Sequence, residues 1–237
     1  MSPPRDPTTG RWYGAIVAVF VTSLIVSNII AVKLVDLFGR TVPAAILLFP
    51  IAYICGDVLT EVYGYAGARR AIWIGFACNG LAVIAIVLGG RLPSSPFWTA
   101  GVYATAEEAQ QAYQAILGFA PRLLGASFVA YLVGEFLNAY VLARMKVASS
   151  GKRLWMRTIG STLVGQGVDS FIFLTLAFGG ILPPPALASA IVTQWTLKVA
   201  YEVVATPVTY LVVDRLKRAE GLDPYDRDTD FSPLHLA

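Results

Sequence analysis

The stretch GDVLTEVYGYAGARR, residues 56–70, decides how this chain folds. It follows an apolar run, it carries the carboxylates Asp57 and Glu61 one helical turn apart, and it ends on Arg69 and Arg70. Two carboxylates at the edge of so apolar a segment are costly to bury, because a charged group loses its hydration there. The stretch therefore predicts a fold in which these charges meet a partner, water or a ligand.

The composition of the whole chain indicates the kind of environment in which it folds. Of its 237 residues, 56% are apolar and only 14% are charged, and the mean hydropathy is +0.63. These values are typical of an integral membrane protein. A spanning helix needs about 20 mostly apolar residues, and the sequence contains six such runs, with approximate limits 12–36, 42–64, 70–90, 117–143, 158–181 and 186–213.

The apolar runs are continuous rather than alternating, which favours helices over the strands of a barrel. We therefore expect an all-α fold, an integral membrane bundle of six transmembrane helices. The first run is too long for a cleaved signal peptide and contains Asn28 and Lys33, so we expect it to stay in the mature protein.

The positive charges indicate the orientation. Thirteen Lys and Arg residues lie before the first run or after the second, fourth and sixth runs, whereas the other connections hold only Arg40, Arg91 and Arg122. The positive-inside rule then places both termini in the cytoplasm. We expect a flexible cytoplasmic tail (1–11), a six-helix transmembrane domain (12–218) and a cytoplasmic C-terminal tail (219–237).

The connection between the third and fourth runs contains a helix-start signal. Thr105 is followed three residues later by Glu108, which is the spacing of a capping box. We expect a short helix here, on the outer side, that acts as a connector or covers an entrance.

Seven ionisable residues fall within or at the edges of the apolar runs. If all were deep and unpaired, their burial would cost about 17–25 kcal/mol, at roughly 2.5–3.5 kcal/mol each. That exceeds the net stability of an ordinary domain, about 5–15 kcal/mol. They must face one another, a water-filled cavity or a ligand; the seven are Lys33, Asp57, Glu61, Glu135, Asp169, Lys198 and Glu202.

Helical spacing groups the polar side chains by face. The alternatives are interhelical pairs that hold the bundle together and a ligand or ion pathway; we favour the pathway, because polar contacts between membrane helices contribute too little to offset burial. The groups are Glu135 and Asn138 on the fourth run, Gln166 and Asp169 with Phe171 adjacent on the fifth, and Gln194, Trp195, Lys198 and Glu202 on the sixth.

This inventory suits a flat heterocycle with N–H donors and carbonyl acceptors. A carboxylate can accept two N–H groups from one edge, an amide or lysine can donate to a carbonyl, and aromatic side chains can stack on the ring. A phosphorylated substrate would call for an Arg or Lys cluster, which the runs lack. The same carboxylates could instead relay protons.

Signatures of other protein classes are absent from the sequence. It contains no G-x-S-x-G, no H-E-x-x-H and no P-loop. Its two cysteines, Cys55 and Cys78, form no CxxC pair, and its one histidine, His235, lies in the tail. We expect no enzymatic activity, no cofactor, no metal site and no nucleic-acid partner.

Four motifs, in this order, resemble the bacterial queuosine precursor transporter family, also called the vitamin uptake transporter family. The resemblance covers nearly all of residues 12–231, and its D-x-x-T-E-x-Y-G pattern at 57–64 is specific. The motifs are SNIIAVKL (27–34), GDVLTEVYGYAGARRAIW (56–73), GQGVDSFIF (165–173) and KVAYEVVATPVTYLVV (198–213).

The resemblance implies uptake of 7-deazaguanine bases, such as the 7-cyano and 7-aminomethyl forms, across the inner membrane for salvage into modified tRNA. Its motifs fall on Asn28, Lys33, Asp57, Thr60, Glu61, Tyr63, Gln166, Asp169, Lys198 and Glu202. It does not say which of these residues contact the ligand.

Combining the resemblance with the residues, we assign roles as hypotheses. Asp57 and Glu61 form a cytoplasmic-side gate or coupling pair, partnered by Lys198 or an arginine. Within the binding site, the N–H edge of the base meets Asp169 or Glu135, its carbonyl or 7-substituent meets Gln166, Asn28 or Lys198, and Trp195 or Phe171 stacks on its ring.

Several alternatives stay open at this point. Transport is facilitative or proton-coupled, because no nucleotide-binding motif is present. The chief rival is a substrate-capture subunit of an energy-coupling-factor vitamin transporter, although the A-x-x-x-A docking pattern is missing from the first run. The glycines of the fifth run, Gly160, Gly165 and Gly167, allow the close packing of a homodimer within the membrane lipid.

Overall fold

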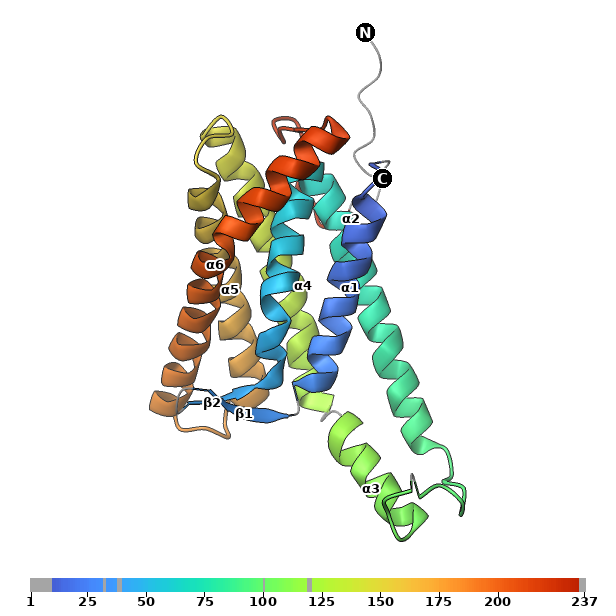
Figure 1. The fold of residues 1–237 in the computed structure, drawn as a ribbon. Coiled ribbons are helices and arrows are strands. Elements are labelled where there is room, and N and C mark those ends of the chain that lie inside the picture. Colours follow the sequence, from blue (N-terminus) through green and yellow to red (C-terminus); the bar gives the residue numbers. More distant parts are fainter. Residues whose placement is uncertain (1–9, 32, 38–39, 100, 119–120, 235–237) are drawn as a thin grey trace.

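Five long helices build the molecule (Figure 1). The computed structural model describes residues 10–31, 33–37, 40–99, 101–118 and 121–234. Each of the five is long and apolar enough to cross a membrane. The sequence therefore correctly predicts a helical membrane bundle; the five are α1 (Tyr13–Ile30), α2 (Phe49–Arg91), α4 (Pro121–Ala148), α5 (Leu154–Phe178) and α6 (Pro184–Glu220).

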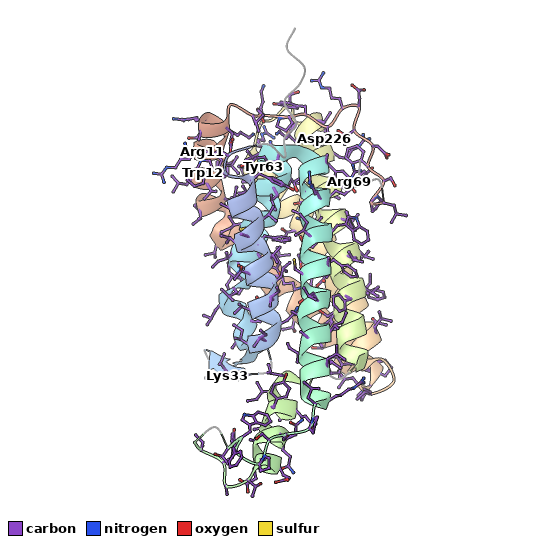
Figure 2. The ribbon with its side chains drawn as sticks, turned by 90° about the vertical axis from the view of Figure 1, so that its right-hand side faces the viewer. Arg11, Trp12, Lys33, Tyr63, Arg69 and Asp226 are labelled. Atoms are coloured by element: carbon purple, nitrogen blue, oxygen red, sulfur yellow. The ribbon has the colours of Figure 1, made fainter. Side chains whose placement is uncertain are left out.

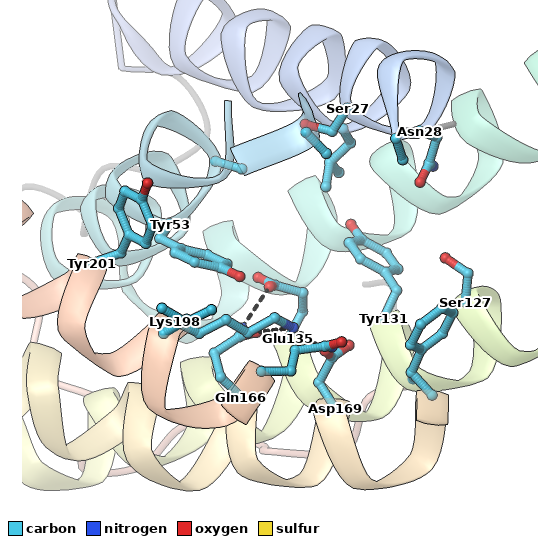
Figure 3. A pocket seen from close by; sticks show the side chains of 18 of the residues that line it. Ser27, Asn28, Tyr53, Ser127, Tyr131, Glu135, Gln166, Asp169, Lys198 and Tyr201 are labelled. Atoms are coloured by element: carbon cyan, nitrogen blue, oxygen red, sulfur yellow. Dashed lines mark hydrogen bonds and ion pairs between the residues drawn. The ribbon is translucent and has the colours of Figure 1, made fainter. Parts of the chain in front are cut away.

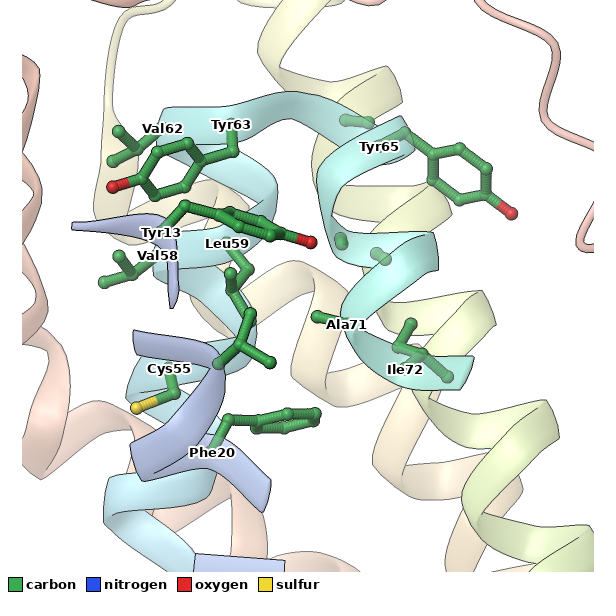
Figure 4. Packing of buried hydrophobic residues seen from close by; sticks show 14 of the residues in the cluster. Tyr13, Phe20, Cys55, Val58, Leu59, Val62, Tyr63, Tyr65, Ala71 and Ile72 are labelled. Atoms are coloured by element: carbon green, nitrogen blue, oxygen red, sulfur yellow. The ribbon is translucent and has the colours of Figure 1, made fainter. Parts of the chain in front are cut away.

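Helix α2 contains two of the predicted runs, and it reverses direction between them. At Gly64 the backbone takes φ 75° and ψ 174°, so the two halves of α2 lie side by side (Figure 4). The sequence predicts a turn made by Gly64 and Gly67 between the runs; Gly64 does make it, but Gly67 already belongs to the second half. A single glycine makes the turn, because this region of φ and ψ is essentially closed to other residues.

The second half of α2 starts on a carboxylate from the C-terminal segment. Asp226 is buried, and its two carboxylate oxygens accept the backbone N–H of Tyr65 at 3.2 and 3.1 Å. An anion at a helix N-terminus satisfies N–H groups that have no partner within the helix. The reversal is thus stabilised by a residue more than 160 positions away in the chain.

A small β-hairpin replaces the predicted end of the first run. Strand β1 (Leu34–Leu37) pairs antiparallel with β2 (Arg40–Pro43), and a 3₁₀ turn (Ala44–Leu47) leads into α2. The expected limit at residue 36 is therefore wrong, because α1 already ends at Ile30. Charged residues at 33, 36 and 40 make this part too polar for the membrane interior.

The apolar core packs α1 against both halves of α2 (Figure 4). Phe20 and Leu59 are each 1% exposed, and Ile72 comes from the second half of α2. The rings of Tyr13 and Tyr63 meet edge to face at 5.2 Å, and the Tyr13 hydroxyl donates to the carbonyl of Gly67 at 2.8 Å. This packing ties the start of α1 to the α2 reversal.

The segment after α6 packs against α2. Arg69 donates from Nη1 to the backbone carbonyls of Asp230 and Ser232, at 2.9 and 2.8 Å, and Trp73 Nε1 donates to that of Pro233 at 2.7 Å. The sequence predicts a flexible tail here, but residues 221–234 lie on the bundle. The flexibility expected at the N-terminus falls largely on residues 1–9, outside the described part.

The start of α1 and the end of α6 lie at the same end of the bundle (Figure 1). The Glu220 carboxylate accepts the backbone N–H groups of Arg11 and Trp12, at 3.0 and 2.6 Å. Figure 2 shows Arg11, Trp12 and Arg69 at this end and Lys33 at the other. The basic connections are thus gathered at one end.

The capping box is confirmed in helix α3 (Ala106–Leu117), which lies near the hairpin end (Figure 1). The Thr105 hydroxyl accepts the N–H of Glu108 at 3.2 Å, and the Glu108 carboxylate accepts the N–H of Ala104 at 3.0 Å. The sequence therefore gives both the existence and the start of this helix correctly.

Replacing Gly64 should destabilise the protein through its backbone. Gly64→Ala forces an L side chain into a conformation that costs about 1–3 kcal/mol, within 3.4 Å of Asp226 and Pro224. We expect a lower midpoint of thermal unfolding for the purified protein in detergent. The matched control is Gly80→Ala, in the same helix and with open space around the new methyl group. Equal stability of the two variants would contradict the assignment.

Candidate functional site

A cavity of about 690 Å³ lies within the bundle, bounded by α1, α2, α4, α5 and α6 (Figure 3). Sites for small molecules commonly have volumes of about 300–1,000 Å³. Apolar side chains form much of its wall, and its polar residues come from all five helices. The polar lining consists of Ser27, Asn28, Tyr53, Asn79, Ser127, Tyr131, Glu135, Gln166, Asp169, Ser189, Thr193, Gln194, Lys198 and Tyr201.

One hydrogen-bonded chain crosses the cavity wall (Figure 3). Lys198 forms an ion pair with Asp169 and donates to the Gln166 side-chain oxygen at 3.0 Å. Gln166 in turn donates from Nε2 to Glu135 Oε1 at 3.4 Å. The chain joins α4, α5 and α6, and it fixes the orientation of the Gln166 amide.

Three tyrosines and Phe173 form the aromatic part of the cavity. Tyr53, Tyr131 and Tyr201 all line it, and the Tyr131 hydroxyl donates to the carbonyl of Ile72 at 3.2 Å. Sequence reasoning includes no Tyr131 among the candidates. Its spacing is the signal that could have found it, because it precedes Glu135 by four residues and so shares a helical face.

A second polar pair lies on the α1 side of the cavity. Asn28 donates from Nδ2 to the side-chain oxygen of Asn79 at 2.9 Å, which joins α1 to the second half of α2. Asn79 is a second lining residue that sequence reasoning misses. No charged residue accompanies it on its helical face, so its position becomes evident only in three dimensions.

The structure brings six of the predicted binding residues together at the cavity. They come from α1, α4, α5 and α6, and four of them belong to the hydrogen-bonded chain that joins α4, α5 and α6. The six are Asn28, Glu135, Gln166, Asp169, Gln194 and Lys198.

Three other predicted residues lie outside the cavity. Lys33 is exposed beyond the end of α1. Phe171 is 58% exposed, because two residues along a helix from Asp169 place it on the opposite side. Trp195 packs on α5, where its Nε1 donates to the carbonyl of Leu163 at 3.0 Å.

The last two predicted binding residues lie deeper than the cavity. Asn138 donates from Nδ2 to Asp57 Oδ1 at 3.2 Å. Glu202 is fully buried, one turn beyond Lys198 on α6, and neither residue lines the cavity. Helical spacing assigned both to the right face, but it could not give their depth.

Glu61 lies at the centre of an ion cluster near the basic end of the bundle. Arg157 donates to both of its carboxylate oxygens, at 2.8 and 3.3 Å. Lys217 and Lys146 approach Glu61 Oε1 at 2.6 and 3.5 Å, and both lysines contact Asp223 Oδ1, at 2.8 and 2.7 Å. We call these five residues the Glu61 cluster.

The sequence predicts that Lys198 or an arginine pairs with Asp57 and Glu61, and the arginine part of this prediction is correct. An arginine does bind Glu61, but Lys198 contacts Asp169 instead. Glu61, Lys146 and Arg157 are each at most 1% exposed. The charges of the cluster therefore meet one another in the protein interior, where an unpaired charge would cost several kcal/mol.

No metal site is evident among the residues that the structure describes. They contain no group of three or more His, Cys, Asp and Glu side chains arranged to hold an ion. Cys55 and Cys78 are both free thiols. His235 lies outside the described residues.

Asp223 should make stability depend on pH. Partial burial would raise its pKa, but hydrogen bonds from Lys146 and Lys217 outweigh burial and hold the pKa below its ordinary value of 3.8. The folded pKa is thus the lower one, so the contribution is complete above about pH 4 and is lost as the pH falls through the folded value. It amounts to at most about 1 kcal/mol, because the side chain is 47% exposed.

We therefore expect Asp223→Asn to unfold at a slightly lower temperature than the wild type at pH 7, with the gap closing in acid. The control is Asp228→Asn, an exposed carboxylate in the same segment. A gap that stays constant from pH 7 to pH 3 would show that the carboxylate charge is unimportant.

Comparisons with known proteins give a consistent family. A family described as "Putative vitamin uptake transporter" matches residues 43–212. The chain is 33% identical over 185 residues to the "Probable queuosine precursor transporter" of Bacillus subtilis, covering 78% of this chain and 77% of the relative. No solved structure matches.

Two further relatives are more distant. The "Queuosine precursor transporter" of Escherichia coli is 26% identical, over 64% of this chain and 62% of its own length. The "Probable queuosine precursor transporter" of Haemophilus influenzae is 24% identical, over 56% and 50%. With bacterial relatives and several long apolar helices, the protein is a multi-pass protein of the bacterial inner membrane. The chain belongs to the vitamin uptake transporter family.

Proposed function

We propose that this protein imports queuosine precursors, 7-deazaguanine bases such as the 7-cyano and 7-aminomethyl forms, for salvage into tRNA. The names of its relatives support this substrate class. The observation that carries the proposal is the chain Glu135–Gln166–Lys198–Asp169, which places acceptors and donors side by side in one cavity.

The base matches this arrangement group by group. Its N1–H and amino group are donors on one edge, which suits a carboxylate that can accept two hydrogen bonds. Glu135 makes one long hydrogen bond among the described residues, to Gln166, so it keeps acceptor capacity for that edge. Asp169 is the alternative acceptor, although it is already paired with Lys198.

The remaining groups of the base have partners in the same cavity. Lys198 or Asn28 can donate to its carbonyl oxygen, and Gln194 can meet the 7-substituent. The ring would stack on Tyr131 or Tyr53, in place of Trp195 and Phe171, which lie elsewhere. Aromatic stacking and two-point hydrogen bonding are both short-ranged, so together they select a flat heterocycle.

Six membrane crossings are part of the proposal. Both halves of α2 count as crossings, since the helix reverses at Gly64. Twelve described Lys and Arg residues lie on α-helix ends or connections at the end where α6 terminates, which supports cytoplasmic termini. The transmembrane domain then covers residues 12–218, with cytoplasmic segments at 1–11 and 219–237.

The Glu61 cluster suits a gate on the cytoplasmic side. It joins α2, α4, α5, α6 and the segment after α6 through one buried carboxylate. Substrate leaving the cavity toward the cytoplasm must pass between these helices. Opening would require the ion pairs to exchange partners or to gain water. The closed state is stable because breaking a buried ion pair without such compensation is costly.

Transport of this kind needs no resident cofactor and no catalytic step. We propose facilitated or proton-coupled uptake by a protein that is not an enzyme and that can form a homodimer. The glycines of α5 do not form the dimer surface, because Gly160, Gly165 and Gly167 pack against Met145, Asn138 and Trp195 of the same chain. The capture-subunit alternative is not favoured by the names of the relatives. Co-purification with ATPase subunits would revive it.

The direct test is uptake of labelled 7-cyano- and 7-aminomethyl-7-deazaguanine by cells that lack their own transporter and synthesis pathway. We expect Asp169→Ala to lower the uptake rate at least tenfold, because it removes one member of the polar chain and leaves Lys198 without its carboxylate. Membrane insertion, measured by immunoblotting of membranes, should stay normal.

The matched control is Phe171→Leu, two residues away on the exposed side of α5. It should transport like the wild type. Normal uptake by Asp169→Ala, or an equal loss of uptake in both variants, would contradict the assignment of the cavity as the binding site.

A further inference from the structure

Two buried carboxylates face each other beneath the cavity. Asp57 is 1% exposed and Glu202 is 0% exposed. Asp57 Oδ1 accepts a hydrogen bond from Asn138, whereas Asp57 Oδ2 and both oxygens of Glu202 have no hydrogen-bond partner of normal geometry among the described residues. Asp57 lies on α2 and Glu202 on α6, two helices that pack against each other. The charge of each acts on the other, and Thr162 lies beside Glu202.

Among the described residues, no cation bonds to the orphaned oxygens of this pair. The charged groups that act on Asp57 are Glu202 on α6, Glu135 on α4 and Glu61 on its own helix, all of them acidic. Of the neighbouring cations, Lys198 is held by Asp169 and Gln166, and Arg157 by Glu61. Two ionised carboxylates cannot persist side by side in such an environment.

The carboxylate oxygens without a hydrogen-bond partner indicate that the pair retains a proton. A carboxyl group that retains its proton can donate an O–H to the neighbouring carboxylate, and this satisfies an oxygen on each side with a strong, charge-assisted bond. A buried polar atom without a partner is rare in a folded protein. One shared proton thus satisfies two of these three oxygens with no additional side chain.

We propose that Asp57 and Glu202 share one proton and form the site through which proton movement is coupled to transport. This inference rests on the proposed transport function and adds its energy source. The proton binds to one carboxylate oxygen and leaves from it, so the only bond made and broken is an O–H bond.

A path joins this site to the cavity. Glu135 lines the cavity, and its Oε2 lies 3.4 Å from the position that a side chain on Gly56 would occupy, next to Asp57. A void of about 10 Å³ is lined by Glu135, Gly56, Thr60 and Asn138, of which Gly56 precedes Asp57 in the chain and Asn138 donates to it. That is roughly the room that one water molecule needs.

The pair also lies on the way to the cytoplasmic gate. Along α2, the cavity residue Tyr53, Asp57 and Glu61 follow at intervals of four residues and so share one face. A proton taken up from the cavity side can therefore be released toward the Glu61 cluster. Protonation removes a negative charge next to that cluster, which changes the balance of charges that keeps it closed.

The test uses the purified full chain in sodium-free proteoliposomes with labelled 7-cyano-7-deazaguanine. Two quantities are measured: exchange of base across the membrane without a gradient, and accumulation driven by an acidic exterior. We expect the wild type to accumulate base at least fivefold above equilibrium, and a protonophore to abolish the accumulation.

In Glu202→Gln and in Asp57→Asn, the ratio of accumulation to exchange should fall at least tenfold. In neither variant can the pair of residues still take up and release the shared proton. The matched control is Glu107→Gln, the same chemical change on the exposed face of α3. Its ratio should equal that of the wild type.

Each outcome has a definite meaning. Wild-type exchange without pH-driven accumulation overturns the proton site but leaves the transport function intact, and this arm needs no variant to fold. The proton site is also overturned if accumulation occurs without a pH gradient and only when sodium is added. The same holds if pH-driven accumulation survives in both Glu202→Gln and Asp57→Asn. Absence of any wild-type exchange refutes the proposed function itself.

Discussion

The cost of burying charge in an apolar bundle is the constraint on which the rest of this structure depends. Glu61 is completely buried, and Arg157, Lys146 and Lys217 from three different helices meet its carboxylate. Asp223, from the segment beyond α6, adds a second negative charge that contacts both lysines. None of these charges could stay in the interior alone, so the cluster fixes the relative positions of α2, α4, α5 and α6 at one end.

The same constraint divides the interior into levels of different character. Around the cavity, Lys198 and Asp169 neutralise each other while Glu135 keeps acceptor capacity facing open space. Below it, no described cation bonds to the free oxygens of Asp57 and Glu202, and in our proposal a shared proton takes that place. At the basic end, full ion pairing closes the bundle. In our proposals, recognition, coupling and gating thus occupy successive depths along the same helices.

The sequence predicts the class of fold, and it identifies several of the residues that line the cavity. Apolar runs locate the long helices, the capping box locates α3, and the intramembrane polar residues identify six cavity residues. These features depend on local pattern or on the energetic cost of burial, and both can be read from a single chain.

The remaining features depend on distant contacts. The single-residue reversal at Gly64 is capped by Asp226, and the order of the segment after α6 rests on Arg69, neither of which follows from local sequence. Helical periodicity gives the face of a residue but not its depth, so it could not separate Glu202 from the cavity. Nor could it distinguish Tyr131, which lines the cavity, from Phe171, which does not.

The central claim is that the cavity between Glu135, Gln166 and Lys198 is where the base binds. A structure of the protein determined with 7-cyano-7-deazaguanine tests it most directly. Our account predicts density for one base in the cavity, with its N–H edge on Glu135 or Asp169 and its ring against a tyrosine. Density for the base at another site, with this cavity unchanged and empty, would contradict it.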